Sequence, residues 1–99
     1  MYAAVGVWNM EAENWEEQQR GLHEDVIPMV KKIPGFVSGY WMADETARKT
    51  YTTSVFEDEA AAQRFASFVL GEMRQGKQAE AGIKNESITV VKVLAEARL

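Results

Sequence analysis

The chain has 99 residues, with 11 basic and 15 acidic side chains, one histidine and no cysteine, and its formal net charge is −4. Without cysteine it forms no disulfide, thiolate nucleophile, iron–sulfur cluster or cysteine-bearing zinc site, and one histidine excludes a multi-histidine metal site within the chain. The negative charge argues against a nucleic-acid partner, which would favour a basic stripe, and no apolar run approaches the ~20 residues of a membrane span.

The first predicted element is a strand over residues 2–10, rich in valine and aromatic residues. Both of its faces are largely apolar, so we expect both to be covered. A helix follows over 14–33, with Asn14 as N-cap and Glu17 completing a capping pair. Pro28 is expected to kink this helix, and Pro34-Gly35 to end it. At about 100° per residue its apolar stripe consists of Trp15, Leu22, Val26, Met29, Val30 and Ile33.

The second half of the chain predicts a hairpin, a helix and a closing strand. Strands over 36–42 and 48–56 are joined by a polar turn at 43–47. Asp58 is a plausible N-cap for a second helix that Gly71 weakens. Its predicted stripe consists of Ala61, Ala62, Phe65, Phe68 and Val69. A short helical piece between Gly76 and Gly82 precedes a last strand over 87–94 and a loose tail.

The order β-α-β-β-α-β predicts an α+β, ferredoxin-like domain spanning residues 1–99, in which two helices cover one face of an antiparallel sheet. The other sheet face then lacks a cover, although the apolar first strand and the Tyr40-Trp41 pair demand one. A second copy of the chain is the simplest source, so we predict a homodimer packed sheet to sheet. Residues 1–5 lack the pattern of a signal peptide, which predicts a cytoplasmic protein.

Several short motifs point to a known superfamily. They are Trp8-Asn9, His23 with Ile27-Pro28, Ile33-Pro34-Gly35-Phe36, Val55-Phe56 before an acidic alanine-rich helix start, and Ala81-Gly82-Ile83. In element order and in these motifs the chain resembles the dimeric α+β barrel superfamily, and more narrowly the antibiotic biosynthesis monooxygenase (ABM) type of domain. The resemblance implies a dimer with a central barrel and a pocket in each subunit between sheet and helices. Members include cofactor-independent oxygenases of quinol-like or polyketide aromatics and haem-degrading enzymes.

The haem-degrading branch uses an asparagine late in the first strand, a tryptophan on the second helix and a histidine further on. Asn9 matches the first by position, but the tryptophan position falls at or near Phe65 and no histidine follows it. Without an axial ligand the haem chemistry is lost. We therefore predict no cofactor.

Three polar residues are candidates for chemistry. His23 is the default proton carrier, although it lies at the edge of the helical stripe and equally suits a solvated flank. Asn9 could hold a substrate carbonyl or phenolate, or simply end its strand and cap the turn. Gln19 lies about 40° from the stripe centre, so its amide either bonds to the sheet or lines a pocket.

The aromatic side chains exceed what so small a core needs, so some of them are candidates to stack on a planar ligand. The candidates for substrate binding are Trp8, Trp41, Phe65 and Phe68, with Gln19 as a polar partner. Thr50, Thr52 and Ser54 share one side of their strand and offer hydroxyls to one space. Two functions fit these residues. One is a small-molecule-pocket protein acting as a cofactor-independent monooxygenase, with His23 and Asn9 catalytic. The other is a non-catalytic homodimer that binds a metabolite or assembles.

Overall fold

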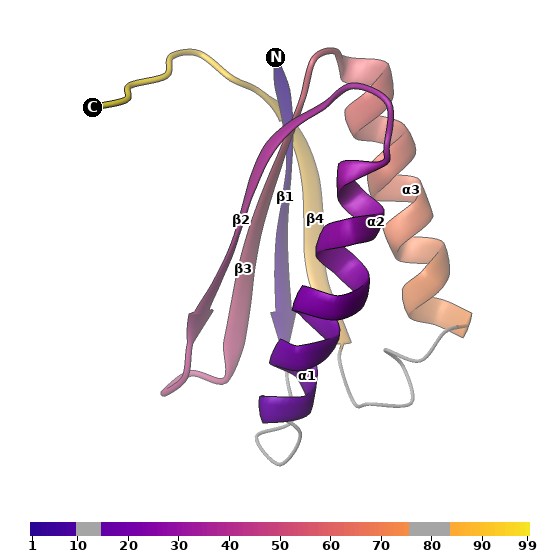
Figure 1. Cartoon of the computed structure of the whole chain (residues 1–99), viewed down its shortest axis with the longest axis vertical. Coiled ribbons are helices and arrows are strands. Elements are labelled where there is room, and N and C mark those ends of the chain that lie inside the picture. Colours follow the sequence, from indigo (N-terminus) through magenta and orange to yellow (C-terminus); the bar gives the residue numbers. More distant parts are fainter. Residues whose placement is uncertain (10–14, 76–83) are drawn as a thin grey trace.

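A computed structural model describes residues 1–9, 15–75 and 84–99. Within these residues four strands form one antiparallel sheet in the order β2-β3-β1-β4. They are β1 (Tyr2–Asn9), β2 (Phe36–Asp44), β3 (Lys49–Phe56) and β4 (Lys84–Lys92). A first helical segment and a second helix, α3 (Glu59–Gln75), cover one face (Figure 1). The predicted α+β, ferredoxin-like fold is confirmed, whereas the Asn14 cap and the piece between Gly76 and Gly82 lie outside the described residues.

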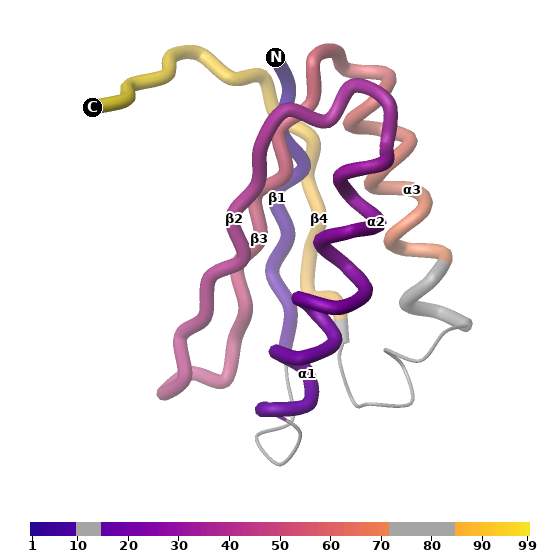
Figure 2. Tube along the Cα trace, viewed as in Figure 1, coloured from indigo at the N-terminus to yellow at the C-terminus, as the bar shows by residue number. Residues whose placement is uncertain are grey.

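The first helical segment contains a wide turn in its middle. It consists of α1 (Trp15–Gly21), the π-helical turn η2 (Leu22–Val26) and α2 (Ile27–Lys31), and Figure 2 shows these as one continuous coil. The N–H of Ile27 donates to the carbonyl of Leu22, five residues back. Pro28 explains this turn, because it lacks an N–H and its ring crowds the turn before it. The kink predicted at Pro28 is therefore a π-helical turn just before the proline.

The second helix begins as predicted, since the Asp58 carboxylate accepts a hydrogen bond from the N–H of Ala61 at 2.8 Å. It then runs through Gly71 to Gln75, further than the sequence suggested. Ala61, Ala62 and Phe65 are buried as expected, together with Ala66, but 46% of Phe68 is exposed. The prediction that Phe68 belongs to the buried stripe is wrong. Ala66 is buried as well, so the centre of the buried face of α3 lies on the side of Phe65 that is turned away from Phe68.

The core lies between this helical layer and the sheet, and Phe56 is at its centre with 0% exposure. The Phe56 ring packs edge-on against Phe36, with ring centres 5.7 Å apart, and tilted against Phe65 at 5.2 Å. Ala4 and Val30 complete the buried contacts around it. Aromatic pairs in such geometries add to the free energy gained from burial.

Gly35, at the end of the first helical segment, requires glycine for two reasons. Its φ is +86°, a left-handed conformation, and a Cβ there would lie 3.1 Å from the Cβ of Ala61. We expect Gly35→Ala to lower the free energy of unfolding by about 1–2 kcal/mol, the cost of a left-handed residue. Urea unfolding followed by circular dichroism measures this. Gly21→Ala is the control, because nothing lies within 4 Å of a Cβ there, and it should not destabilise the fold.

The sheet side away from the helices, here called the open face, is covered by no helix within the described residues. The pairing register places on it Ala3, Val5, Val7 and Asn9 of β1, Ser38, Tyr40 and Met42 of β2, Lys49, Tyr51, Thr53 and Val55 of β3, and Ser87, Thr89 and Val91 of β4. Tyr40 is 69% exposed, and Met42, Tyr51 and Val91 are exposed as well. The open face therefore presents large apolar side chains to solvent in the isolated chain. Among the described helices, none is long and apolar enough to cross a membrane.

Candidate functional site

The helix-facing side of the sheet carries small and hydroxyl-bearing residues beside two tryptophans. Strand alternation places Trp8 and Gly6 of β1 on this side, opposite Thr50 and Thr52 of β3. Ser54 of β3 is on the same side and is buried. This confirms that the three hydroxyl residues of β3 share one side. These residues face the helices and the core.

The Trp8 side chain is held in one position on the sheet. Its indole Nε1 donates a hydrogen bond to Oγ1 of Thr52 at 3.1 Å, and the residue is only 8% exposed. A Cβ on Gly6 would lie 2.8 Å from that Nε1 and 2.7 Å from the threonine oxygen. Gly6 therefore lets the indole lie directly against the strand backbone.

Trp41 repeats the arrangement on β2. A Cβ on Gly39 would lie 3.0 Å from two atoms of the Trp41 six-membered ring, so this indole also lies over a glycine of its own strand. Thr52 pairs with Trp41 on one side and with Gly6 on the other. The two indoles therefore flank Thr52. We call Trp8, Trp41 and Thr52 the indole floor.

The first helical segment contains a buried amide without a hydrogen-bond partner in the described part of the chain. Gln18 of α1 is half-buried, and its Nε2 and Oε1 atoms each expose less than 1 Å². Neither atom has a hydrogen-bond partner in the described part of the chain. Trp15 and Leu22 are three and four residues away, on the same helix face, and are also half-buried. Such an unpaired buried group costs about 1–3 kcal/mol, so a partner is needed.

The two helices approach the sheet differently. The backbone of α3 comes close to β1, β3 and β4, whereas no part of the 15–31 segment comes comparably close to a strand. Ala61, Ala62 and Ala66 allow the close approach of α3, since helix packing distance depends on the side chains at the contact. Only residues 10–14 separate β1 from α1, so α1 lies at the end of β1 that carries Trp8. Gln18 and Trp8 thus lie toward the same end of the helix–sheet layer.

The predicted site residues do not gather in one place. Trp8, Trp41 and Phe65 lie in the layer between helices and sheet, and Phe68 is exposed on α3. Gln19 and His23 are both exposed. Asn9 is half-buried on the open face, where it pairs with Lys49.

The prediction that Gln19 lies near the core is wrong, and its neighbour Gln18 is the inward residue. The predicted stripe combined residues on both sides of η2 as if the helix were uniform. A π-helical turn has more residues than an α-helical one, so it rotates α1 relative to α2. The true inward face of α1 is therefore shifted toward Gln18. Pro28 is the sequence signal that could have indicated this shift.

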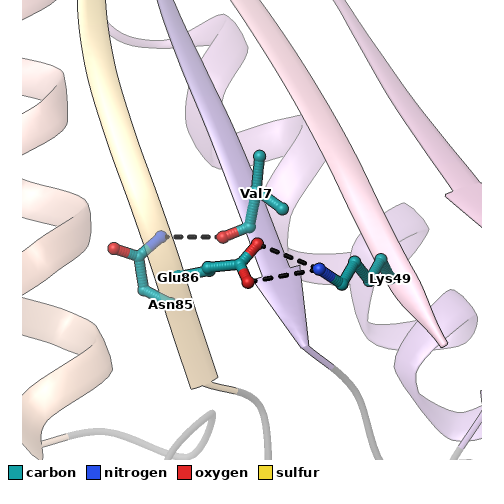
Figure 3. A network of polar contacts seen from close by, with 4 residues as sticks. All are labelled: Val7, Lys49, Asn85 and Glu86. Carbon is teal, nitrogen blue, oxygen red and sulfur yellow. Dashed lines mark hydrogen bonds and ion pairs between the residues drawn. The ribbon is translucent and has the colours of Figure 1, made fainter. Parts of the chain in front are cut away.

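A polar network joins β3, β1 and β4 at the end of the sheet where Asn9 pairs with Lys49 (Figure 3). Nζ of Lys49 contacts both carboxylate oxygens of Glu86 at 3.2 Å, so the ion pair spans β1 from β3 to β4. The register shifts between Val7 and Trp8, and the Asn85 amide donates to the Val7 carbonyl at 3.2 Å. A bulge of this kind re-aims side chains, here turning Glu86 toward Lys49. Asn9 therefore lies beside an ion pair and on the sheet side opposite to the indole floor.

Comparisons with known proteins identify the fold. No family model and no curated protein matches the sequence. Among solved structures, a candidate antibiotic biosynthesis monooxygenase from Deinococcus radiodurans superposes with a TM-score of 0.76 at 12% identity, over 100% of this chain and 98% of the other. The chain has the ferredoxin-like fold of the ABM-like proteins. The resemblance noted in the sequence is thus confirmed at the level of fold.

Two other structures share this ABM-like fold. The haem degrader MhuD from Mycobacterium tuberculosis, solved with two haems in its active site, has a TM-score of 0.71 at 16% identity, over 99% of this chain and 100% of its own. A dimeric ferredoxin-like protein from an uncultured marine organism has a TM-score of 0.72 at 10% identity, over 99% and 98%. Identities this low establish the shared ABM-like fold alone.

The described residues of this chain do not fit haem. The single histidine, His23, is exposed on the first helical segment, and Asn9 faces away from the helices. Haem iron needs an axial ligand inside its pocket, which His23 does not supply. Among the described residues no cluster of three or more histidines and carboxylates could hold a metal ion either.

The Trp8 position depends on Gly6, which gives a direct test. We expect Gly6→Ala to displace the indole from Thr52 and lower the free energy of unfolding by about 1–3 kcal/mol, as overpacking does. The indole N–H signal of Trp8 in NMR spectra should shift with the loss of its hydrogen bond. Gly71→Ala is the matched control, because it adds the same methyl group to open space on α3 and should leave stability equal or higher. An unchanged Trp8 signal in Gly6→Ala would contradict the packing described.

Proposed function

We propose that this chain is a homodimeric small-molecule-binding protein whose ligand enters between the first helical segment and the indole floor. Two observations carry the proposal: the Gln18 amide of α1 is buried without a hydrogen-bond partner in the described part of the chain, and the Trp8 indole is held in place on the helix-facing side of the sheet. An apolar, aromatic-lined space with few convergent polar groups is typical of small-molecule sites. The binding of haems by MhuD is consistent with a pocket in this fold. The cytoplasmic location expected from the sequence remains part of this proposal.

The homodimer part of the proposal rests on the open face. Tyr40, Met42, Tyr51 and Val91 form an exposed apolar surface, of the kind that marks an interaction site. A second open face is its best match, because two sheets packed face to face bury such side chains between them. The dimeric ferredoxin-like neighbour supports this arrangement.

A second candidate function is a cofactor-independent monooxygenase acting on a quinol-like or polyketide aromatic. The Deinococcus neighbour favours it through its name. In such a reaction the methylene group of an anthrone loses two hydrogens and gains one oxygen atom from O2, while the other oxygen atom leaves as water. The protein would favour the ionised substrate in a dry space. The catalytic roles predicted for His23 and Asn9 remain predictions within this candidate.

One titration tests the binding function and separates the two candidates. Anthrone is added to the ¹⁵N-labelled protein while indole N–H signals and dissolved oxygen are both recorded. Binding predicts a saturable shift of the Trp8 signal, assigned with Trp8→Phe. Protein-dependent oxygen uptake would favour the monooxygenase, and uptake unchanged in His23→Ala and Asn9→Ala would remove both residues from the site. If anthrone, naphthalene and 2-quinolone all leave the Trp8 signal unshifted, the proposed ligand site is wrong.

A further inference from the structure

The Gln18 amide is the most unusual buried group in the described part of the chain. Its Nε2 and Oε1 atoms are both withdrawn from water, and neither has a hydrogen-bond partner among residues 1–9, 15–75 and 84–99. The neighbours on the same face are Trp15 and Leu22, which are half-buried and largely apolar, with the Trp15 indole N–H as their one side-chain hydrogen-bonding group. A leucine at position 18 would therefore suit a purely structural contact better than glutamine, since an unpaired buried amide destabilises the fold. The amide makes physical sense when a bound molecule completes its hydrogen bonds.

The surroundings of Gln18 define the charge of that molecule. The charged residues of α1, Glu16, Glu17 and Arg20, are all exposed. On the sheet side, the indole floor consists of two indoles and one hydroxyl. No described charged side chain of α1 or the indole floor is thus available to neutralise an ionised ligand group there. Burying an unpaired charge costs much more than burying a neutral polar group, so these described surroundings favour an uncharged ligand edge.

The hydrogen-bonding groups of the Gln18 amide indicate which groups the bound edge of the ligand must carry. A glutamine side chain presents an N–H donor and an oxygen acceptor next to each other in one plane. Its complement is a planar edge with a neighbouring acceptor and donor, as in a lactam or a hydroxy-carbonyl group. The indole of Trp8, held against Gly6, offers a flat surface for the rest of a planar ring system.

We infer that Gln18 is the specificity residue of the site and binds, through two adjacent hydrogen bonds, the lactam or hydroxy-carbonyl edge of an uncharged planar ligand. This inference rests on the proposed binding function and adds the class of molecule that the site selects. It also assigns selectivity to a residue on α1, and to neither of the exposed polar residues Gln19 and His23.

Three bicyclic probes test the inference. 2-Quinolone has the lactam edge, N-methyl-2-quinolone lacks the donor of that edge, and naphthalene lacks both polar groups. Each is titrated into the unmodified chain, into Gln18→Leu and into Gln19→Leu, with affinity measured from the Trp8 indole signal and by calorimetry. Gln19→Leu is the matched control, because it makes the same change on the exposed side of the same helix turn.

We expect Gln18→Leu to weaken 2-quinolone binding at least tenfold and to leave naphthalene binding equal or tighter. N-methylation of 2-quinolone should weaken its binding to the unmodified chain by a similar factor. It should have no further effect on binding to Gln18→Leu, because both changes remove the same interaction. Gln19→Leu should bind all three probes as the unmodified chain does.

Two results overturn the inference and leave the binding function intact. One is naphthalene binding to the unmodified chain without 2-quinolone binding. The other is 2-quinolone binding that changes neither with Gln18→Leu nor with N-methylation. Failure of all three probes to bind any variant overturns the binding function, and the inference with it. The comparison of 2-quinolone with its N-methyl derivative on the unmodified chain needs no variant, so it stands even if Gln18→Leu folds poorly.

Discussion

Replacing Phe56 with alanine is expected to lower the free energy of unfolding by about 3–5 kcal/mol, the usual cost of removing a buried phenylalanine ring. The ring has 0% exposure and contacts Phe36 and Phe65, which belong to β2 and α3. Its removal therefore leaves a cavity at the central contact between the sheet and the helical layer. For a small domain this loss is a large fraction of the total stability. Urea unfolding followed by far-ultraviolet circular dichroism measures it.

Phe36→Ala is the comparison for this prediction, because its ring contacts the same Phe56 ring from the half-buried end of β2. We expect a smaller loss for Phe36→Ala than for Phe56→Ala. Equal losses in the two variants would mean that Phe56 is not the centre of the core. Phe56→Leu should recover part of the stability, since it restores most of the buried apolar volume.

Replacing Val5 with aspartate is expected to convert a dimer into monomers. Val5 lies at the middle of β1 on the open face, with Thr53 and Thr89 as its strand partners. In a sheet-to-sheet dimer the new carboxylate would be buried without a counter-charge, which costs about 2–5 kcal/mol. The dimer dissociation constant should rise by roughly 30-fold to several thousand-fold, since each 1.4 kcal/mol corresponds to a factor of ten. Sedimentation velocity at micromolar concentration measures the change.

Gln63→Asp is the control for the dimer prediction, because it adds a carboxylate to an exposed position of α3, on the other side of the molecule. It should sediment as the unmodified chain does. Circular dichroism of Val5→Asp should show a folded protein, since Val5 is only half-buried in the single chain. A stable monomer formed by the unmodified chain at micromolar concentration would contradict the sheet-to-sheet dimer.

The sequence predicts the fold well because its signals are local. Asp58 has the side chain of an N-cap and accepts the expected hydrogen bond from Ala61. The alternation of Thr50, Thr52 and Ser54 indicates one side of a strand whatever that strand packs against. These patterns depend on neighbouring residues alone, so the order of elements along the chain and the start of α3 follow from the sequence with little tertiary information.

The site is predicted less well because it depends on long-range geometry. Asn9 and Trp8 are adjacent, and strand alternation alone cannot say which of them faces the helices. The core contacts decide which residue faces the helices. Ala4 packs against Val30 and Phe56, and Trp8 lies on the same side of β1 as Ala4, so Trp8 faces the helices. Gln18 was missed for a related reason, since one extra residue in η2 changes which face of α1 is inward.

A crystal structure of the chain grown with 2-quinolone tests the central claim most directly. The account predicts the ligand between α1 and the indole floor, with its lactam edge within hydrogen-bond distance of both amide atoms of Gln18 and its ring against the Trp8 indole. It also predicts two copies packed through their open faces. A structure in which Gln18 bonds to another part of the protein, and the ligand is absent from this layer or bound elsewhere, would contradict the account.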